Sequence, residues 1–128
     1  FKVNDVDQSD FVIGLGITDT TPLDTTDGIF FISADGDAGL DFLVEKDNSA
    51  TTTEDVATMA DDTFITVAWY VDPNTSLVYY SINHAEPVGV ANTNVPNDEE
   101  LTVSFGIQNG EAAAQTMTID YVTAMVER

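Results

Sequence analysis

Cysteine is absent from this chain of 128 residues. Disulfide bonds therefore cannot stabilise the fold, and thiolate metal sites and thiol nucleophiles are excluded. Long apolar runs are absent too, because the longest, residues 11–17, is far short of the roughly 20 residues that span a bilayer as a helix. The chain opens at Phe1 without an initiator methionine, and we expect a processed or truncated amino terminus with residues missing ahead of it.

Basic side chains are scarce: Lys2, Lys46 and Arg128 stand against 23 acidic residues, and the formal net charge is −20. Nucleic acid phosphates and anionic lipids are bound by clustered lysine and arginine. We therefore expect neither nucleic acid nor a membrane as a partner. Such a charge suits high salt, a basic partner or cations, and solubility is its simplest interpretation.

The dominant positive signal is an alternation of apolar and polar residues with period 2, which is typical of half-buried strands. Hydrophobic residues make up 43% of the chain, enough for the core of a single domain. The segments with this pattern are 10–17, 63–71, 101–107 and 116–126, followed by 28–34, 40–46, 76–83 and 87–91, and more weakly by 1–3 and 51–58. We predict an all-β fold: an antiparallel two-sheet sandwich of about ten strands in one domain, residues 1–128.

Two of these segments, 28–32 and 67–71, are apolar on both faces. This pattern predicts central strands, with one face on the core and the other covered by a loop or a neighbouring chain. Helix signals are weak. Residues 53–62 could form one or two turns that place Val56, Met59 and Ala60 together, and residues 111–115 could form another, but neither is long enough to be stable alone.

The acidic loop from Asp35 to residue 41 invites comparison with a calcium site. Counted from Asp35, Asp37 fits the third position of an EF-hand loop, but glycine and leucine occupy the fifth and sixth positions and Lys46 the twelfth. A site that joins Asp35 and Asp37 to carbonyls of another loop stays open. The favoured interpretation is a hairpin turn, with Asp35 and Gly36 in type I′ geometry.

Catalytic constellations are hard to find. Asp41 and Glu45 share one strand face about 13 Å apart, whereas glycosidase pairs need about 5 to 9.5 Å. Asp61 and Asp62 are adjacent, and in a strand they would point in different directions. His84, the single histidine, lies near no nucleophile motif and is expected in a turn. We expect no enzyme, and therefore no catalytic residue, cofactor or metal site.

Aromatic residues gather on two neighbouring strands. Trp69 shares its face with apolar residues and is expected in the core, where an alanine substitution would cost roughly 3 to 5 kcal/mol. Of Tyr70, Tyr79 and Tyr80, we expect Tyr70 or Tyr80 to be exposed, as in sugar-stacking surfaces, and most of the group to serve the core or a subunit contact. Asn74 begins a weak glycosylation motif in an expected surface turn.

The second half of the chain carries a family resemblance. An aromatic strand at 63–72 leads through a turn to a strand that ends in Asn83, and residues 86–90 follow. A late strand, 118–122, precedes the polar end Glu127-Arg128. With residues 10–17 and 27–31, this resembles concanavalin A-like (laminin-G-like) jelly-roll domains in structural proteins of tailed bacteriophages. Members of that family are usually longer, with strands ahead of the first one here, so this is either a compact variant or a chain without its N-terminal part. The calcium or lectin loops of the family are not matched.

The resemblance implies a virion component on the surface of a phage particle, such as a capsid decoration (cement) protein. Its expected partners are the major capsid protein or other virion proteins, and further copies of itself in a symmetric homo-oligomer. Two alternatives are a carbohydrate-binding module or phage adhesin, with an exposed aromatic and calcium near Asp35 and Asp37, and a sandwich-fold glycosidase. The carboxylate spacing disfavours the glycosidase.

Overall fold

The computed structural model describes residues 1–17, 21 and 23–126. These residues form ten antiparallel strands, joined by turns and loops, and contain no helix. The strands are β1 (Lys2–Val3), β2 (Ser9–Gly16), β3 (Gly28–Ser33), β4 (Gly39–Lys46), β5 (Ser49–Thr58), β6 (Val67–Asp72), β7 (Leu77–Ile82), β8 (Val88–Ala91), β9 (Thr102–Asn109) and β10 (Met117–Thr118). The prediction of an all-β antiparallel fold with about ten strands is confirmed. This part of the chain holds no helix that could cross a membrane.

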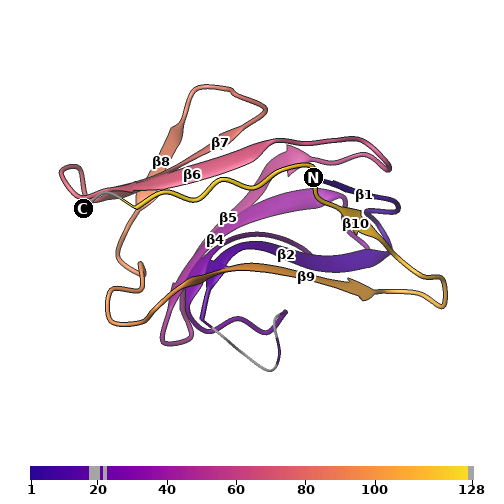
Figure 1. Ribbon diagram of the computed structural model, residues 1–128, viewed down its shortest axis with the longest axis horizontal. Helices are drawn as coiled ribbons and strands as arrows, with labels where there is room; N and C mark the ends of the chain where they lie inside the picture. The colour runs from indigo at the N-terminus through magenta and orange to yellow at the C-terminus, as the bar shows by residue number, and fades with distance from the viewer. Residues whose placement is uncertain (18–20, 22, 127–128) are drawn as a thin grey trace.

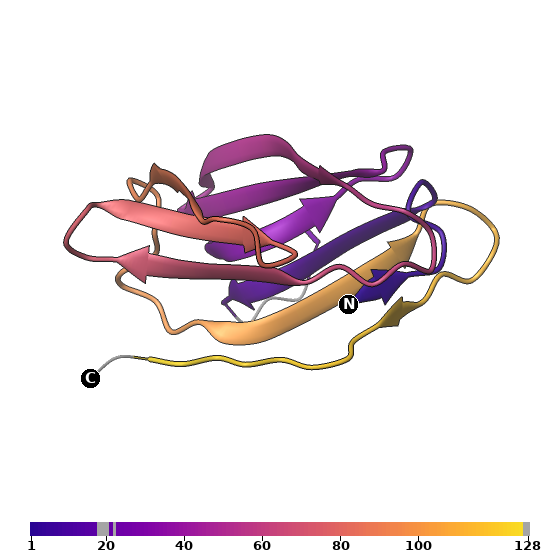
Figure 2. The same ribbon diagram turned by 90° about the horizontal axis from the view of Figure 1, so that it is seen from above.

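The strands form two facing layers (Figures 1 and 2). One layer is a five-stranded sheet with the order β5-β4-β3-β2-β9. The other holds the three-stranded sheet β6-β7-β8 and the pair β1-β10. These two parts are linked, because Phe1 and Ile65 exchange backbone hydrogen bonds of 2.9 and 2.8 Å just ahead of β6. The arrangement is sandwich-like.

The main core lies between the layers and follows from the period-2 pattern. Phe11, Phe31 and Phe42 are fully buried on the inner face of the five-stranded sheet. From the opposite layer, Val78 and Tyr80 of β7 reach into the same cluster. Each strand therefore presents its alternate apolar residues to the other layer, as pleating requires.

A second, smaller cluster covers the outer face of the five-stranded sheet. Val12, Phe30 and Leu43 are buried there, and Ile32 of β3 and Leu23 of the connection between β2 and β3 pack against them. The central strand of this sheet is β3. The prediction for residues 28–32, a central strand whose second face is covered by a loop, is therefore confirmed.

The prediction for residues 67–71 is wrong, because β6 lies at the edge of the three-stranded sheet. Only β7 pairs with it along its length. The strand predicted at 116–126 is also shorter than expected, since only Met117–Thr118 are paired, and residues 119–126 have no assigned partner strand. The polar end, Glu127-Arg128, lies outside the described residues.

Neither predicted helix forms. Residues 53–58 belong to β5, which was the weaker alternative, and residues 111–115 are bends and irregular chain. In β5 the pairing with β4 shifts between Leu40 and Phe42, and Asp55 has a positive φ of 54°. This irregularity is a β-bulge, stabilised by the Asp55 amide, which donates to Asp41 Oδ1 at 2.8 Å.

Three short turns fix the hairpin registers. The turn after β3 is confirmed but its type is not: only Gly36 has a positive φ, and the Asp37 amide donates to the Ala34 carbonyl, which matches type II with glycine in third place. Type I′ signatures, with two successive positive φ values, occur instead at Asp47-Asn48 and at Asn83-His84.

Candidate functional site: a tyrosine surface

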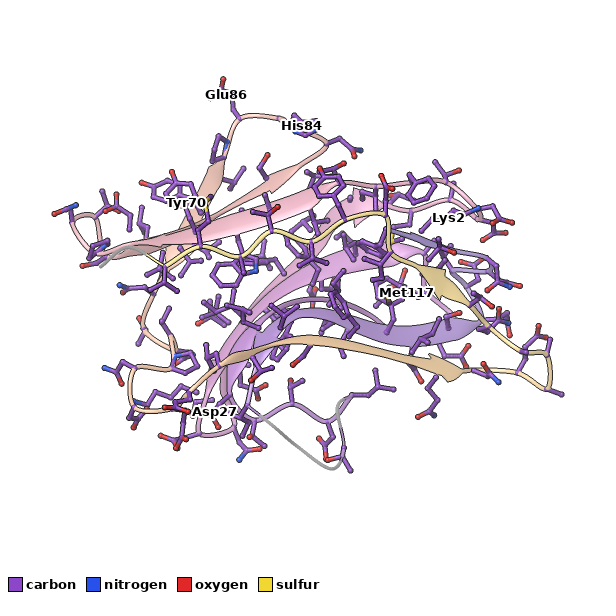
Figure 3. The ribbon with its side chains drawn as sticks, viewed as in Figure 1. Lys2, Asp27, Tyr70, His84, Glu86 and Met117 are labelled. Carbon is purple, nitrogen blue, oxygen red and sulfur yellow. The ribbon has the colours of Figure 1, made fainter. Side chains whose placement is uncertain are left out.

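The outer face of the three-stranded sheet carries two stacked aromatic rings, of which Tyr70 is exposed and Tyr79 is half-buried. The rings of Tyr70 and Tyr79, directly opposite each other on β6 and β7, are stacked with centroids 5.0 Å apart and an interplanar angle of 15°. Tyr70 is 50% exposed, and Figure 3 shows it on the side turned away from the five-stranded sheet. We call Tyr70, Leu77, Tyr79 and Gly89 the tyrosine surface.

Pleating decides which aromatics reach this surface. Tyr70 and Tyr79 occupy one face of the sheet, so the next residues, Trp69 and Tyr80, occupy the other. Tyr80 is only 8% exposed, and Trp69 is half-buried against the core. The prediction of a core-facing Trp69 is confirmed, and the exposed member of the group is Tyr70 and not Tyr80.

A glycine on β8 completes the tyrosine surface. Gly89 lies opposite Tyr79, and a Cβ added there would come within 3.1 Å of Tyr79 Cε1 and 3.0 Å of Leu77 Cδ1. The Tyr79 ring therefore packs over the glycine backbone, and this contact orients the ring on which Tyr70 stacks. The glycine in the apolar segment 87–91 was the sequence signal for this close approach.

The acidic loop residues have local structural roles. Asp37 Oδ1 accepts a hydrogen bond of 2.8 Å from the Gly39 amide, and Asp10 Oδ1 accepts one of 2.7 Å from the Asp35 amide. Among the residues that the structure describes, no three or more histidine, aspartate or glutamate side chains lie close enough to hold a metal ion. The tyrosine surface is thus the better-defined candidate.

The paired acids do not converge. Asp61 Oδ1 accepts from the Val6 amide at 2.9 Å, whereas Asp62 forms an ion pair of 2.7 Å with Lys2. Asp41 stabilises the bulge in β5. His84 is exposed in the turn between β7 and β8, as predicted, and Figure 3 shows it at the tip of that turn. Asn74 is likewise exposed in the turn between β6 and β7.

The sequence pattern does not predict that Glu45 is buried. It is 9% exposed on the outer face of β4 and accepts a hydrogen bond of 2.9 Å from Thr25 Oγ1. Burial raises the pKa of the Glu45 carboxyl; the hydrogen bond from Thr25 opposes the rise, and the charges of Asp27 and Asp24 add to it. Asp27, labelled in Figure 3, is itself buried.

We predict that Glu45→Gln stabilises the fold at pH 7. A raised pKa means that the ionised carboxylate is less favourable in the folded state than in the unfolded state. This penalty is fully present above the folded-state pKa and vanishes below the unfolded-state value of about 4.3. Thermal unfolding from pH 3.5 to 8 should show a higher melting temperature for the variant at pH 7, and a difference that shrinks as the pH falls. A pH-independent difference would contradict the prediction.

Glutamine keeps an oxygen that can accept from Thr25, so the substitution mainly removes the charge. Glu54→Gln on the exposed edge strand β5 is the matched control. Its charge is solvated in both states, and its melting temperature should follow that of the unmodified chain.

Comparison of the chain with protein-family models, with curated proteins and with solved structures finds no match. The function is therefore argued from the chemistry of the tyrosine surface, the charge of the molecule and the resemblance in its strand motifs. Of these, the tyrosine surface is the most specific, because the exposed Tyr70 ring, held by its stacking on Tyr79, offers an apolar face and a polar hydroxyl to a partner.

Proposed function

We propose that this protein is a virion structural protein: a jelly-roll sandwich that decorates a bacteriophage capsid and docks by protein-protein contacts. The observation that carries the proposal is the exposed Tyr70 ring on the outer face of the three-stranded sheet, stacked on the half-buried ring of Tyr79. The strand motifs that resemble phage jelly-roll proteins supply the virion context.

Tyrosines suit the centre of a protein interface. They are enriched in interface cores and among the residues whose truncation costs most binding energy. In this protein the two rings are already ordered before binding, because their stacking and the contact of Tyr79 with Gly89 hold them in place. A fixed aromatic loses little side-chain entropy on binding, so more of the buried area contributes to affinity.

The negative charge of this molecule indicates the kind of partner surface to which it would bind. Lys2 is paired with Asp62 and Lys46 with Asp98, at 2.7 and 2.9 Å. The basic residues of the described chain are thus already neutralised, and the excess of acid is left on the surface. Such a surface accelerates encounter with a basic protein patch and repels acidic ones. A basic region of the major capsid protein is therefore the expected docking site.

Repetition strengthens a weak contact. A decoration protein present in many copies, or assembled as a symmetric homo-oligomer, binds a shell of repeated sites through avidity. A single small tyrosine surface is then sufficient for stable attachment. The proposed location is the outer surface of the phage particle.

The test begins with the particle. Mass spectrometry of purified virions should find this chain in many copies, and purified chain should co-sediment with capsids that lack it. Its absence from virions, together with failure to co-sediment, would overturn the proposal.

We predict that Tyr70→Ser weakens capsid binding by about tenfold or more, the size of a typical interface residue of this kind. The melting temperature should fall by no more than a few degrees, because Tyr70 lies outside the core and only its ring stacking is lost. Tyr121→Ser is the matched control: this tyrosine is 63% exposed and does not belong to the tyrosine surface. Equal loss of binding by both variants would contradict a specific role for the tyrosine surface.

The stacked pair also favours a second candidate, a carbohydrate-binding module or adhesin, since sugar rings stack on exposed aromatic faces. Glycan-array binding that Tyr70→Ser abolishes would support it. Loss of that binding on chelation would further indicate a calcium ion near Asp35 and Asp37.

A further inference from the structure

Strand β6 has hydrogen-bonding groups with no partner on one side. Because Phe1 and Ile65 exchange both backbone bonds, alternation places the N–H and C=O groups of Val67, Trp69 and Val71 on the same side as those of Ile65. The intervening residues bond to β7 on the other side. Within the described part of the chain, no residue pairs with Val67, Trp69 or Val71 on the open side.

The space beside the open side of β6 is bordered on its far side by the chain that follows β10. Lys2 pairs with Thr118 and Val3 with Met117, so residues 119–126 continue away from β1. In Figure 1 these residues run at the level of β6 and in the same direction, and Figure 2 shows the two segments apart, with the amino end of β1 directed between them. One strand in line with β1 would be antiparallel to both.

Apolar side chains opposite this position are poorly covered. Phe105 and Val103 of β9 pair with Ile13 and Leu15, so they lie on the inner face of the five-stranded sheet. They are nevertheless 41% and 38% exposed, whereas the inner-face residues Ile29, Phe31, Phe42 and Val44 of β3 and β4 are buried and Ile13 and Leu15 of β2 are half-buried. One further strand in the opposite layer, facing β9, would cover these two side chains.

We propose that the residues joined to the amino side of Phe1 form an eleventh strand, which lies between β6 and residues 119–126 and closes this layer. The Phe1 nitrogen already occupies the place of a ladder amide, since it donates to the Ile65 carbonyl at 2.9 Å. Phe1 itself is buried. Burial lowers the pKa of this amino group, with Asp120 opposing. A charged amine is disfavoured there, whereas a peptide N–H fits.

The ladder sets the register of the eleventh strand. With Phe1 opposite Ile65, the first residue ahead of Phe1 faces Thr66, the second Val67 and the fourth Trp69. Since Phe1 points into the core, the second, fourth and sixth residues ahead must point there too. These three positions should be apolar and the alternate ones polar. This strand also accounts for the two apolar faces of β6, which are typical of a central strand.

The test adds seven residues ahead of Phe1 in the 128-residue chain. One extension has valine at the second, fourth and sixth positions ahead of Phe1 and threonine elsewhere. The control extension has the same composition, with valine at the first, third and fifth positions. The in-phase extension should raise the melting temperature by about 5 °C or more, and slow amide exchange of Val67, Trp69 and Val71 by about tenfold or more. The control should do neither.

Equal effects of the two extensions, or unchanged exchange at the three amides, would overturn the proposal. The in-phase peptide added separately, with capped ends, tests covalent continuity. It should protect these amides far less than the fused extension does. Equal protection by the free peptide would assign the position to a strand from another molecule instead.

A crosslink provides a second measurement that does not depend on stability. The described chain has no free cysteine. A cysteine at the third position ahead of Phe1 would lie opposite Ala68→Cys in a non-hydrogen-bonded pair, with Cα atoms about 4.5 Å apart, which suits a disulfide. Oxidation should crosslink this pair. The control, Ser81→Cys on β7, lies one strand further away and should not crosslink. Crosslinking of both or of neither would contradict the register.

Discussion

Phe42→Ala is expected to destabilise the fold by about 3 to 5 kcal/mol. Phe42 is fully buried, and its ring lies 5.0 Å from those of Phe31 and Tyr80. Phe31 and Tyr80 also meet edge to face at 6.5 Å. Because Tyr80 belongs to the opposite layer, this three-ring cluster joins the two layers. Removing its central member leaves a cavity where the layers are held together.

A loss of that size is a large fraction of the roughly 5 to 15 kcal/mol that stabilises a typical domain. Urea denaturation followed by circular dichroism should therefore show a large shift of the midpoint. Phe42→Leu, which keeps most of the volume, should cost no more than about 1.5 kcal/mol. Phe64→Ala is the matched control, because Phe64 is 54% exposed. A cost for Phe42→Ala as small as that of Phe64→Ala would show that the layers are not joined at this cluster.

The sequence predicts the strands well where the pattern is local. In β2 and β9, alternation alone identifies both the strand and the face that is turned inward, because each side chain's direction follows from the pleat. Phe11 and Ile107 are paired across these strands, and both contribute to the core. The same reasoning separates Trp69 from Tyr70.

Sequence reasoning fails where an irregularity interrupts the alternation. In β5 the bulge adds two residues between the pairs Leu40–Ala57 and Phe42–Thr53, and beside it Val56 packs against the core as well as Ala57. Val56 and the buried Met59 are three residues apart. A spacing of three resembles a helical stripe. The signal that decides between them is tertiary: Asp41 holds the Asp55 amide from the neighbouring strand, and nothing in the local sequence reveals that contact.

A local sequence pattern also does not predict which strands pair with each other. Residues 116–126 alternate as regularly as β9, yet only Met117–Thr118 are paired. A strand needs a neighbour, and the neighbour of residues 119–126 would be the strand proposed ahead of Phe1. Likewise, Tyr70 was a candidate from its position, but its stacking on Tyr79 and the role of Gly89 depend on strands whose register the sequence does not specify.

Trp69→Ala is expected to cost about 3 kcal/mol, at the low end of the range for buried large aromatics. The indole packs against the main core but is only half-buried, because its strand borders the open position beside β6. Far-UV circular dichroism in urea is the appropriate measurement, since the variant lacks the only tryptophan. Tyr70→Ala, the next residue on the opposite face, should cost about 1 kcal/mol through its lost ring stacking.

The Trp69→Ala substitution also measures how much further the eleventh strand would bury the indole ring. In the chain with the in-phase extension, Trp69 should be more deeply buried, and Trp69→Ala should then cost about 4 to 5 kcal/mol. With the phase-shifted extension its cost should stay near that in the unextended chain. A cost below about 1 kcal/mol in every background, together with lost capsid binding, would instead place Trp69 in a contact surface.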